Sequence, residues 1–212
     1  MKTLIATALL AASLAAPATS LPAASPASAS AARPLATTTD GCLASVPDPG
    51  TTAPVEICYT IFRPAGATAR HRVPMVVHSH GWGGQRETDP SAFAPFLRHR
   101  YAVISFDQRG FGESGGHAYV ENPAVEGHDV RRLVALVSRL SWVRQDGPGD
   151  PRMAAIGGSY GGGYQFLTAF EEMRAKGNPV LDALAPEITW NDLGDSLAPQ
   201  GVVRTEWAAA LS

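Results

Sequence analysis

Ser159 lies in a pattern that can turn a serine hydroxyl into a nucleophile. It is the central residue of Gly157-Gly158-Ser159-Tyr160-Gly161, directly after the apolar run 154–156. When a strand turns sharply through a serine into a helix, the hydroxyl is lifted above the edge of a sheet. Gly157 and Gly161 would keep that turn free of side chains for which it has no room. The pattern predicts a nucleophile elbow, although a glycine-rich turn with an idle serine would share this short motif.

Tyr160 and Trp82 are the candidate donors to the oxygen of a reacting substrate. The predicted turn aims the Tyr160 N–H at the space in which an oxyanion would form. The second donor is expected in the loop His80-Gly81-Trp82-Gly83-Gly84, which follows the apolar run 73–78. Its glycines would let the backbone come close to a substrate oxygen, so the Trp82 N–H is the candidate. The alternative for this loop is an ordinary glycine turn with a packed tryptophan.

Apolar runs and amphipathic segments alternate along the chain and predict the elements that hold these loops. Strands are expected over residues 55–62, 73–78, 101–106, 153–156 and 181–189. A short helix is expected over 92–98, and longer helices follow Asn122 and the elbow. Their apolar faces are expected to be Val130, Leu133, Val134, Val137 and Leu140 in the first and Tyr164, Leu167, Phe170 and Met173 in the second.

Strands that alternate with helices predict an α/β fold with a mostly parallel sheet flanked by helices. The longer helix before the elbow is expected to begin with Asn122 as its N-cap and Pro123 in its first turn. In a parallel sheet, ligands bind at the carboxyl ends of the strands. The loops 80–84, 107–116 and 157–161 would all meet at that edge.

The N-terminal residues 1–29 have the pattern of a secretory signal peptide. Lys2 precedes an apolar Ala/Leu-rich stretch over 4–16, and the small residues Ala27-Ser28-Ala29 follow. The stretch is too short to be a stable membrane anchor. We therefore expect a secreted, extracellular protein in which residues 30–40 form a flexible lead-in.

Cys42 and Cys58 are the two cysteines of the chain. In an oxidising compartment they are expected to form one disulfide between the N-terminal segment and the first predicted strand. Two buried free thiols are the alternative. A zinc site is not expected, because no second pair of ligands lies nearby.

The composition limits the partners of the protein. The chain has 212 residues, which is the length of a single domain with a sizeable core. Its formal net charge is −2. Its basic residues are dispersed, so neither nucleic acid nor an anionic membrane is expected as a partner. No cofactor or metal is expected, since His78 and His80 lack a third ligand at suitable spacing.

The segment Gly110-Phe111-Gly112-Glu113-Ser114-Gly115 formally matches a dinucleotide-binding fingerprint and so favours an oxidoreductase as a rival interpretation. That fingerprint should open a helix directly, whereas further loop residues follow here. Asp107 and Arg109, just before it, are interpreted as a structural salt-bridged turn. The dinucleotide interpretation is therefore the weaker one.

Three motifs in this order resemble the α/β-hydrolase superfamily. They are His80-Gly81-Trp82-Gly83-Gly84, Asp107 to Gly116, and Gly157 to Gly162. Ser159-Tyr160-Gly161-Gly162, together with 185–193 and 196–199, resembles the branch of Xaa-Pro dipeptidyl-peptidases and cocaine-esterase-like hydrolases. The resemblance runs from about Val55 to the last residue. It implies that Ser159 is the nucleophile and the Tyr160 amide an oxyanion donor. Many members use a tyrosine hydroxyl as the other donor, a role that Trp82 could fill only through its backbone N–H.

The resemblance also implies that an acid and then a histidine follow the nucleophile in the chain. All six histidines precede Ser159, at positions 71, 78, 80, 99, 117 and 128. His80 belongs to the predicted oxyanion loop, and Asp192 is a candidate for the acid. We therefore expect residues 41–212 to be the N-terminal part of a catalytic domain, ending within the lid and before the last strands. Such a piece would be inactive alone.

These observations predict a secreted serine hydrolase that cleaves a peptide, amide or ester bond through an acyl-enzyme on Ser159. An Xaa-Pro dipeptidyl-peptidase-like activity on a small peptide or ester substrate is favoured over simple esterase activity. A catalytically inactive hydrolase or binding module is the alternative, because no histidine follows Ser159. The sequence leaves the scissile bond and the oligomeric state open.

Overall fold

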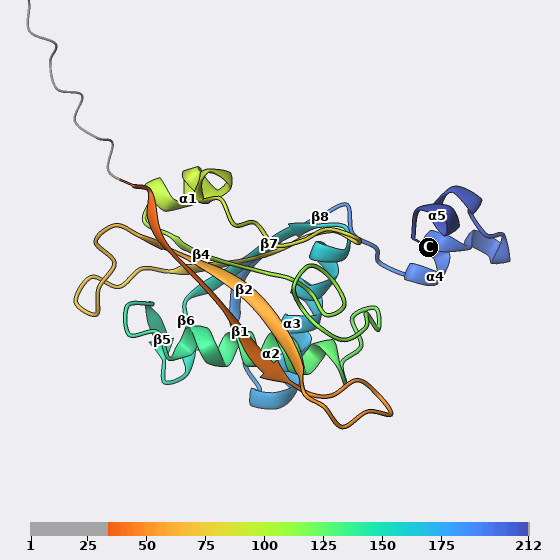
Figure 1. Cartoon of the computed structure of the whole chain (residues 1–212), viewed down its shortest axis with the longest axis horizontal. Helices are drawn as coiled ribbons and strands as arrows, with labels where there is room; N and C mark the ends of the chain where they lie inside the picture. Colours follow the sequence, from red (N-terminus) through yellow and green to blue (C-terminus); the bar gives the residue numbers. More distant parts are fainter. Residues whose placement is uncertain (1–33, 212) are drawn as a thin grey trace, which may run out of the picture. The chain divides into compact units, whose positions relative to one another are not determined.

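This computed structural model describes residues 34–211. The centre of this part of the chain is a mixed β-sheet (Figure 1). Within these residues the sheet has six strands in the order β1-β2-β4-β3-β7-β8. The strands are β1 Ala36–Ser45, β2 Val55–Pro64, β3 Met75–Ser79, β4 Ala102–Phe106, β7 Met153–Gly158 and β8 Leu181–Glu187. β2 is antiparallel to both β1 and β4, whereas β4, β3, β7 and β8 are parallel to one another. A separate two-stranded ribbon consists of β5 Gln145–Gly147 and β6 Asp150–Pro151.

Helices cover both faces of the sheet (Figure 1). The 3-10 turn Pro90–Phe93 and α1 Ala94–Arg98 lie on one face, where Phe93 and Leu97 pack with buried residues of β2, β3 and β4. On the other face, α2 Glu126–Ser138 and α3 Tyr160–Lys176 pack on the larger core. After β8 come α4 Leu193–Leu197, a 3-10 turn Pro199–Gly201 and α5 Thr205–Ala210. The expected α/β fold is therefore present.

The central strands are buried on both faces, as their continuous apolar sequences predict. All five residues of β4 are buried, and Met75, Val76 and Val77 of β3 are at most 5% exposed. The chain runs from β3 through α1 to β4 on one side, then through α2 to β7 on the other. The connections thus change direction at β3, and such a switch point places a binding crevice at the carboxyl ends of the strands.

The expected flexible lead-in over 30–40 is wrong from residue 36 onward. Ala36 to Asp40 form the first half of β1, which pairs with β2 from Ala36–Pro64 to Ser45–Val55. Three successive threonines, Thr37 to Thr39, are β-branched and fit a half-exposed edge strand. The predicted signal peptide, residues 1–29, and residues 30–33 lie outside the described residues.

The expected start of the helix at Asn122 is also wrong, because α2 begins at Glu126. Asn122 instead makes a local turn in which its side-chain oxygen accepts a hydrogen bond from the Ala124 N–H at 2.9 Å. Two left-handed residues, Val120 and Glu121, precede it and prevent a helical entry. The predicted buried face is confirmed for Val130, Leu133, Val134 and Val137. Leu140 lies beyond the end of the helix and is partly buried against the same core.

The apolar face expected for the helix after the elbow divides in two. Tyr164 and Leu167 are buried, whereas Phe170 and Met173 are 68% and 47% exposed. The buried pair faces the sheet, and the exposed pair lies on a side of α3 that no described element covers. Gly177 ends the helix in the left-handed conformation, as the Lys176-Gly177 sequence predicts. No helix within residues 34–211 has the length and apolar character needed to cross a membrane.

Candidate active site

Ser159 lies at the sharp turn between β7 and α3. Its backbone has φ 55° and ψ −120°, a strained conformation with positive φ that a residue with a side chain adopts only when its surroundings hold it there. The Ser159 N–H donates to the Glu187 carbonyl at 2.9 Å, which ties the turn to the end of β8. The strand–turn–helix context that the serine motif requires is therefore present.

The two glycines that flank this turn have no room for a side chain. A Cβ atom at Gly157 would lie 2.5 Å from the Gly161 carbonyl oxygen, and Gly157 itself has φ 148°. A Cβ atom at Gly161 would lie 2.4 Å from the Ser79 carbonyl oxygen and 2.8 Å from that of His80. The glycine spacing thus allows the end of β3 to lie directly against the turn.

The loop 80–84 lies beside Ser159, as expected from the sheet order. A Cβ atom at Gly81 would be 3.6 Å from the Ser159 Cβ atom, so the two backbones are close neighbours. Trp82 is 37% exposed, and its ring packs edge-on against Phe111 at 4.9 Å and Tyr160 at 5.1 Å. The first of the three predicted loops therefore meets the elbow.

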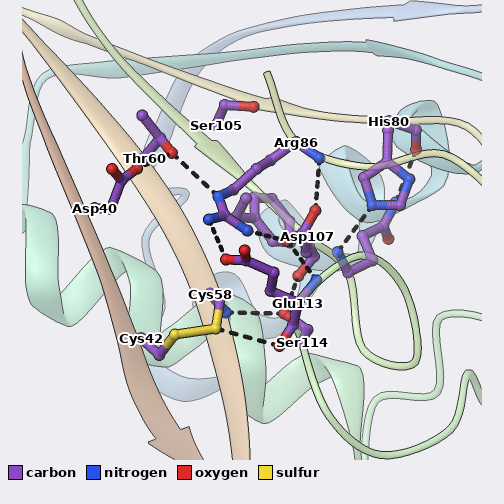
Figure 2. Close-up of polar contacts among 12 residues, drawn as sticks. Asp40, Cys42, Cys58, Thr60, His80, Arg86, Ser105, Asp107, Glu113 and Ser114 are labelled. Carbon is purple, nitrogen blue, oxygen red and sulfur yellow. Dashed lines mark hydrogen bonds and ion pairs between the residues drawn. A yellow bond between two sulfur atoms is a disulfide. The ribbon is translucent and has the colours of Figure 1, made fainter. Parts of the chain in front are cut away.

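His80 ties this loop to the neighbouring loop 107–116 (Figure 2). Its Nδ1 lies 2.7 Å from the Gly81 carbonyl oxygen, and its Nε2 accepts the Gln108 N–H at 3.2 Å. The Gln108 side chain returns a hydrogen bond to the His80 carbonyl at 3.1 Å. Burial lowers the pKa of His80, which favours the neutral ring that these bonds need. Both ring nitrogens are engaged, so His80 orients the loop.

A pocket of about 680 Å³ opens over Ser159. It brings together the three predicted site residues Trp82, Ser159 and Tyr160. It is further lined by residues from the loop before α2 and from the segment after β8, among them Val120, Ile188, Trp190, Asp192, Arg204 and Trp207. Most of its lining is apolar or aromatic, which is typical of a pocket for an organic ligand.

Asp107 and Arg109 are ion-paired structural residues, as expected, but their partners come from elsewhere in the chain. Arg86 donates to Asp107 through its backbone N–H at 2.6 Å and through its guanidinium (Figure 2). Arg109, fully buried, bonds Asp129 on α2 at 2.8 and 2.6 Å and Asp48 at 2.8 Å. These pairs hold the loop 107–116 between α2 and the segment after β1.

The dinucleotide interpretation of 110–115 lacks its structural context. The segment forms tight turns, and the next helix, α2, begins only at Glu126. Gly112 has φ 56°, and a Cβ atom there would lie 2.3 Å from the Asp107 carboxyl. The glycines therefore serve to fold this loop over Asp107.

The disulfide expected between Cys42 and Cys58 is present, and it joins directly opposite residues of β1 and β2. The Cys58 N–H donates to the Ser114 hydroxyl at 2.8 Å, which in turn donates to the Asp107 carbonyl at 2.8 Å (Figure 2). The crosslinked strand pair is thereby connected to the loop that supports His80.

No histidine among residues 34–211 is placed by these contacts as a base for Ser159. His78 lies on β3 with its Nδ1 2.9 Å from the Ser105 hydroxyl and its ring against Phe93. Asp192, the candidate acid, lines the pocket but uses its carboxylate to cap α4 by accepting the Asp195 N–H at 3.0 Å. Within the same residues, no cluster of three His, Cys, Asp or Glu side chains could hold a metal ion.

Sequence reasoning missed the contribution of the loop before α2 to this site. Val120 lines the pocket, and Glu121 lies behind it against Gly163. Neither residue belongs to a recognisable motif. Two successive residues of left-handed backbone cannot be anticipated from a Val-Glu pair, since both residue types avoid that conformation.

Known proteins that resemble this chain extend well beyond the length it covers. It is 30% identical over 153 residues to an uncharacterised 31.7 kDa protein of the traX-finO intergenic region of Escherichia coli. That match covers 71% of this chain and 48% of the relative. The chain thus spans about half the length of the curated relatives that it matches first.

Two solved structures share the fold at low sequence identity. A hypothetical protein from Pseudomonas aeruginosa matches with a TM-score of 0.56 and 18% identity, over 84% of this chain and 52% of its own. The α/β hydrolase GrgF from Penicillium sp. sh18 matches with a TM-score of 0.50 and 17% identity, over 71% and 46% respectively. The sheet order, the turn at Ser159 and these matches define an α/β-hydrolase fold.

The family comparison covers most of the chain. The family model described as X-Pro dipeptidyl-peptidase (S15 family) matches residues 53–211, from just before β2 to the end of the described chain. The chain therefore belongs to the X-Pro dipeptidyl-peptidase (S15) family of hydrolases.

Proposed function

We propose that Ser159 is the nucleophile of a secreted serine hydrolase that cleaves peptide, amide or ester bonds. The observation that carries this proposal is the placement of Ser159, which lines the pocket and is held with positive φ in a sharp turn flanked by Gly157 and Gly161. Strained backbone of this kind is maintained where a site needs it. Family membership favours a small peptide with an N-terminal Xaa-Pro dipeptide over a simple ester as the substrate.

In the proposed reaction, the Ser159 hydroxyl oxygen attacks the substrate carbonyl carbon while a base takes its proton. The Tyr160 N–H at the start of α3 and the Trp82 N–H of the adjacent loop stabilise the negative oxygen of the tetrahedral intermediate. The carbon–nitrogen or carbon–oxygen bond then breaks, the leaving group takes the proton, and an acyl ester remains on Ser159. Attack by water releases the acid and restores the hydroxyl.

The base in this proposal is an imidazole from outside residues 1–212. All six histidines precede Ser159 in the chain, and His80, in the loop beside it, has both ring nitrogens engaged. A longer form of the chain or a partner chain would supply it. Without an imidazole, a serine of this kind retains only the part of catalysis that comes from binding and oxyanion stabilisation.

A fluorophosphonate probe tests the nucleophile. In protein isolated from its native source, wild type is expected to take up one probe per chain, and Ser159→Ala to take up none. Ser91→Ala, which removes an exposed serine hydroxyl, serves as the matched control and is expected to label like wild type. Labelling that persists in Ser159→Ala would exclude Ser159 as the nucleophile.

The intact mass and N-terminal sequence of the same material test export and the source of the base. Removal of residues 1–29 is expected if the chain is secreted. A mass well above 22.2 kDa would show that further chain accompanies these residues.

A catalytically inactive binding protein is the second candidate, favoured by the engaged ring of His80. It predicts that a peptide ligand is bound by the pocket over Ser159 and recovered uncleaved after prolonged incubation. Turnover of that peptide by the native protein would exclude it.

A further inference from the structure

Glu121 carries a buried carboxyl group that the proposed reaction does not use. Both of its carboxyl oxygens are buried, and neither has a hydrogen-bond partner among residues 34–211. An ionised carboxylate that loses its water without gaining a partner is very unfavourable, so a group in this position is protonated. Burial raises the pKa of Glu121 well above its ordinary value, and the charges of Glu126 and Asp129 raise it further.

The backbone turns Glu121 inward through an unfavourable conformation. Val120 and Glu121 are successive left-handed residues, with φ of 58° and 61°. A β-branched valine is a clear outlier in this region. On either side of the pair, the N–H groups of Tyr119 and Asn122 donate to the Glu126 carboxylate, the latter at 3.0 Å. The first turn of α2 thus holds the strained pair from both ends.

The side chain of Glu121 rests on the bare first turn of α3. A Cβ atom at Gly163 would lie 3.2 Å from the Glu121 Cγ atom and 2.7 Å from the Trp190 Cη2 atom. Glu121 and Trp190 therefore share the space that the missing side chain of Gly163 leaves. Trp190 stacks on Tyr160, with ring centroids 6.1 Å apart and planes 26° from parallel. Glu121 is in this way packed behind the aromatic wall of the pocket.

The charged and titratable groups around Glu121 come from the two helices that enclose it. α2 contributes Glu126 and Asp129, and α3 contributes Tyr160 and Tyr164. The Tyr160 hydroxyl is buried and lies close to the backbone of Val120 and Glu121. Burial, and then the charges of Glu121 and Glu126, raise the pKa of Tyr160. None of these four groups is a cation that could balance an ionised Glu121, and Asp129 already bonds Arg109.

We infer that Glu121 is a positioning residue, which as a neutral acid holds Trp190 against Tyr160 and the first turn of α3, and which releases this wall of the pocket when it ionises. A neutral acid fits an apolar space, whereas a carboxylate is repelled by Glu126 and Asp129 and draws water between the helices. The effect on the hydrolase reaction rests on the proposed function, because it acts through the Tyr160 N–H. The effect on the pocket itself is independent of it.

The stability of Glu121→Gln against pH is the first test. An acid whose pKa is raised by folding contributes stability below its unfolded pKa, and that contribution is lost as pH rises. Thermal unfolding of wild type and Glu121→Gln is therefore expected to coincide at acid pH and to diverge, in favour of the variant, at neutral and alkaline pH. Glu56→Gln, which removes an exposed carboxylate on β2, is the control and should follow wild type throughout. Parallel curves for wild type and Glu121→Gln would overturn the inference.

Tryptophan fluorescence is the second test, because Trp190 reports directly on the wall. Wild type is expected to change its emission with a midpoint well above the ordinary pKa of a glutamate, and this transition should be absent from Glu121→Gln and from Trp190→Phe. A transition that survives in Glu121→Gln would contradict the inference.

Fluorophosphonate labelling of the native-length protein separates the inference from the proposed function. Wild type is expected to label several-fold more slowly above the midpoint of the fluorescence transition than below it, a decrease that Glu121→Gln should lack. Glu121→Ala, which leaves the wall unsupported, should be slow on both sides of that midpoint. Absence of labelling in every variant would contradict the role of Ser159, while the unfolding and fluorescence measurements would still decide the role of Glu121.

Discussion

The carbonyl oxygen of Ser79 lies 2.4 Å from the position that a Cβ atom would take at Gly161. The end of β3 and the start of α3 therefore approach each other more closely than any residue with a side chain would allow. The same approach brings the loop 80–84 against Ser159, where a Cβ atom at Gly81 would be 3.6 Å from that of the serine. The absence of a side chain at Gly161 thus allows the loop 80–84 to lie close to Ser159.

Gly161→Ala is expected to destabilise the protein, because backbone atoms of Ser79 and His80 would have to move. Overpacking of this kind costs about 1–3 kcal/mol or more in the free energy of unfolding. Urea denaturation measures the loss. Gly147→Ala is the matched control, since a Cβ atom there would meet its nearest neighbour at an ordinary 3.7 Å. Equal effects of the two substitutions would show that the close approach at Gly161 is unimportant.

Asp107→Asn is expected to lower the free energy of unfolding strongly. The change leaves the buried Arg86 guanidinium beside a neutral amide, and breaking a buried ion pair costs roughly 3–5 kcal/mol. Asp146→Asn breaks the more exposed pair with Arg152 and should have a far smaller effect. Denaturant unfolding of both variants provides the comparison, and a loss at Asp107 no greater than at Asp146 would refute the prediction.

His78 is expected to make the protein acid-sensitive. Burial, with a further contribution from His80, lowers the pKa of His78 from 6.5 to about 4. Because the unfolded chain takes up the proton first, stability is complete above about pH 6.5 and declines as the pH falls toward 4. The decline attributable to His78 amounts to at most about 3 kcal/mol. Unfolding measured across this window should give a shallower decline for His78→Gln, and an unchanged slope would contradict the prediction.

The double variant Cys42→Ser, Cys58→Ser is expected to unfold more readily than wild type. The disulfide spans a sequence separation of 16 residues, for which the chain-entropy estimate is about 3 kcal/mol. Dithiothreitol should destabilise wild type to a similar extent and leave the double variant unaffected. A shift of the double variant by the reductant would show that the effect does not come from this bond.

Much of the fold could be predicted because it depends on local patterns. The buried strands β3 and β4 are short runs rich in apolar residues. The glycines on either side of Ser159 indicate a tight turn in which other residue types would clash with the backbone. β1 escaped prediction because its polar, threonine-rich sequence resembles a linker. It becomes a strand only by pairing with β2, from Ala36–Pro64 to Ser45–Val55.

The start of α2 shows why local signals can mislead. Asn122 followed by Pro123 is a common way to begin a helix, yet the helix starts at Glu126. The Glu126 carboxylate binds the N–H groups of Tyr119 and Asn122 and so holds the preceding residues in a turn. In the same loop the side chain of Glu121 packs against Gly163 of α3, a contact that a local window of sequence does not contain.

The sequence by itself determined the α/β class, the elbow at Ser159, the partner loop with Trp82 and the pairing of Cys42 with Cys58. Each depends on residue types at short spacing, or on a choice among two cysteines. Only the tertiary structure decided that Arg109 binds Asp48, 61 residues away, and that the Glu121 carboxyl group is buried behind the pocket with no hydrogen-bond partner among residues 34–211. Such contacts arise where distant segments cross, and the burial that fixes protonation exists only once the chain has folded.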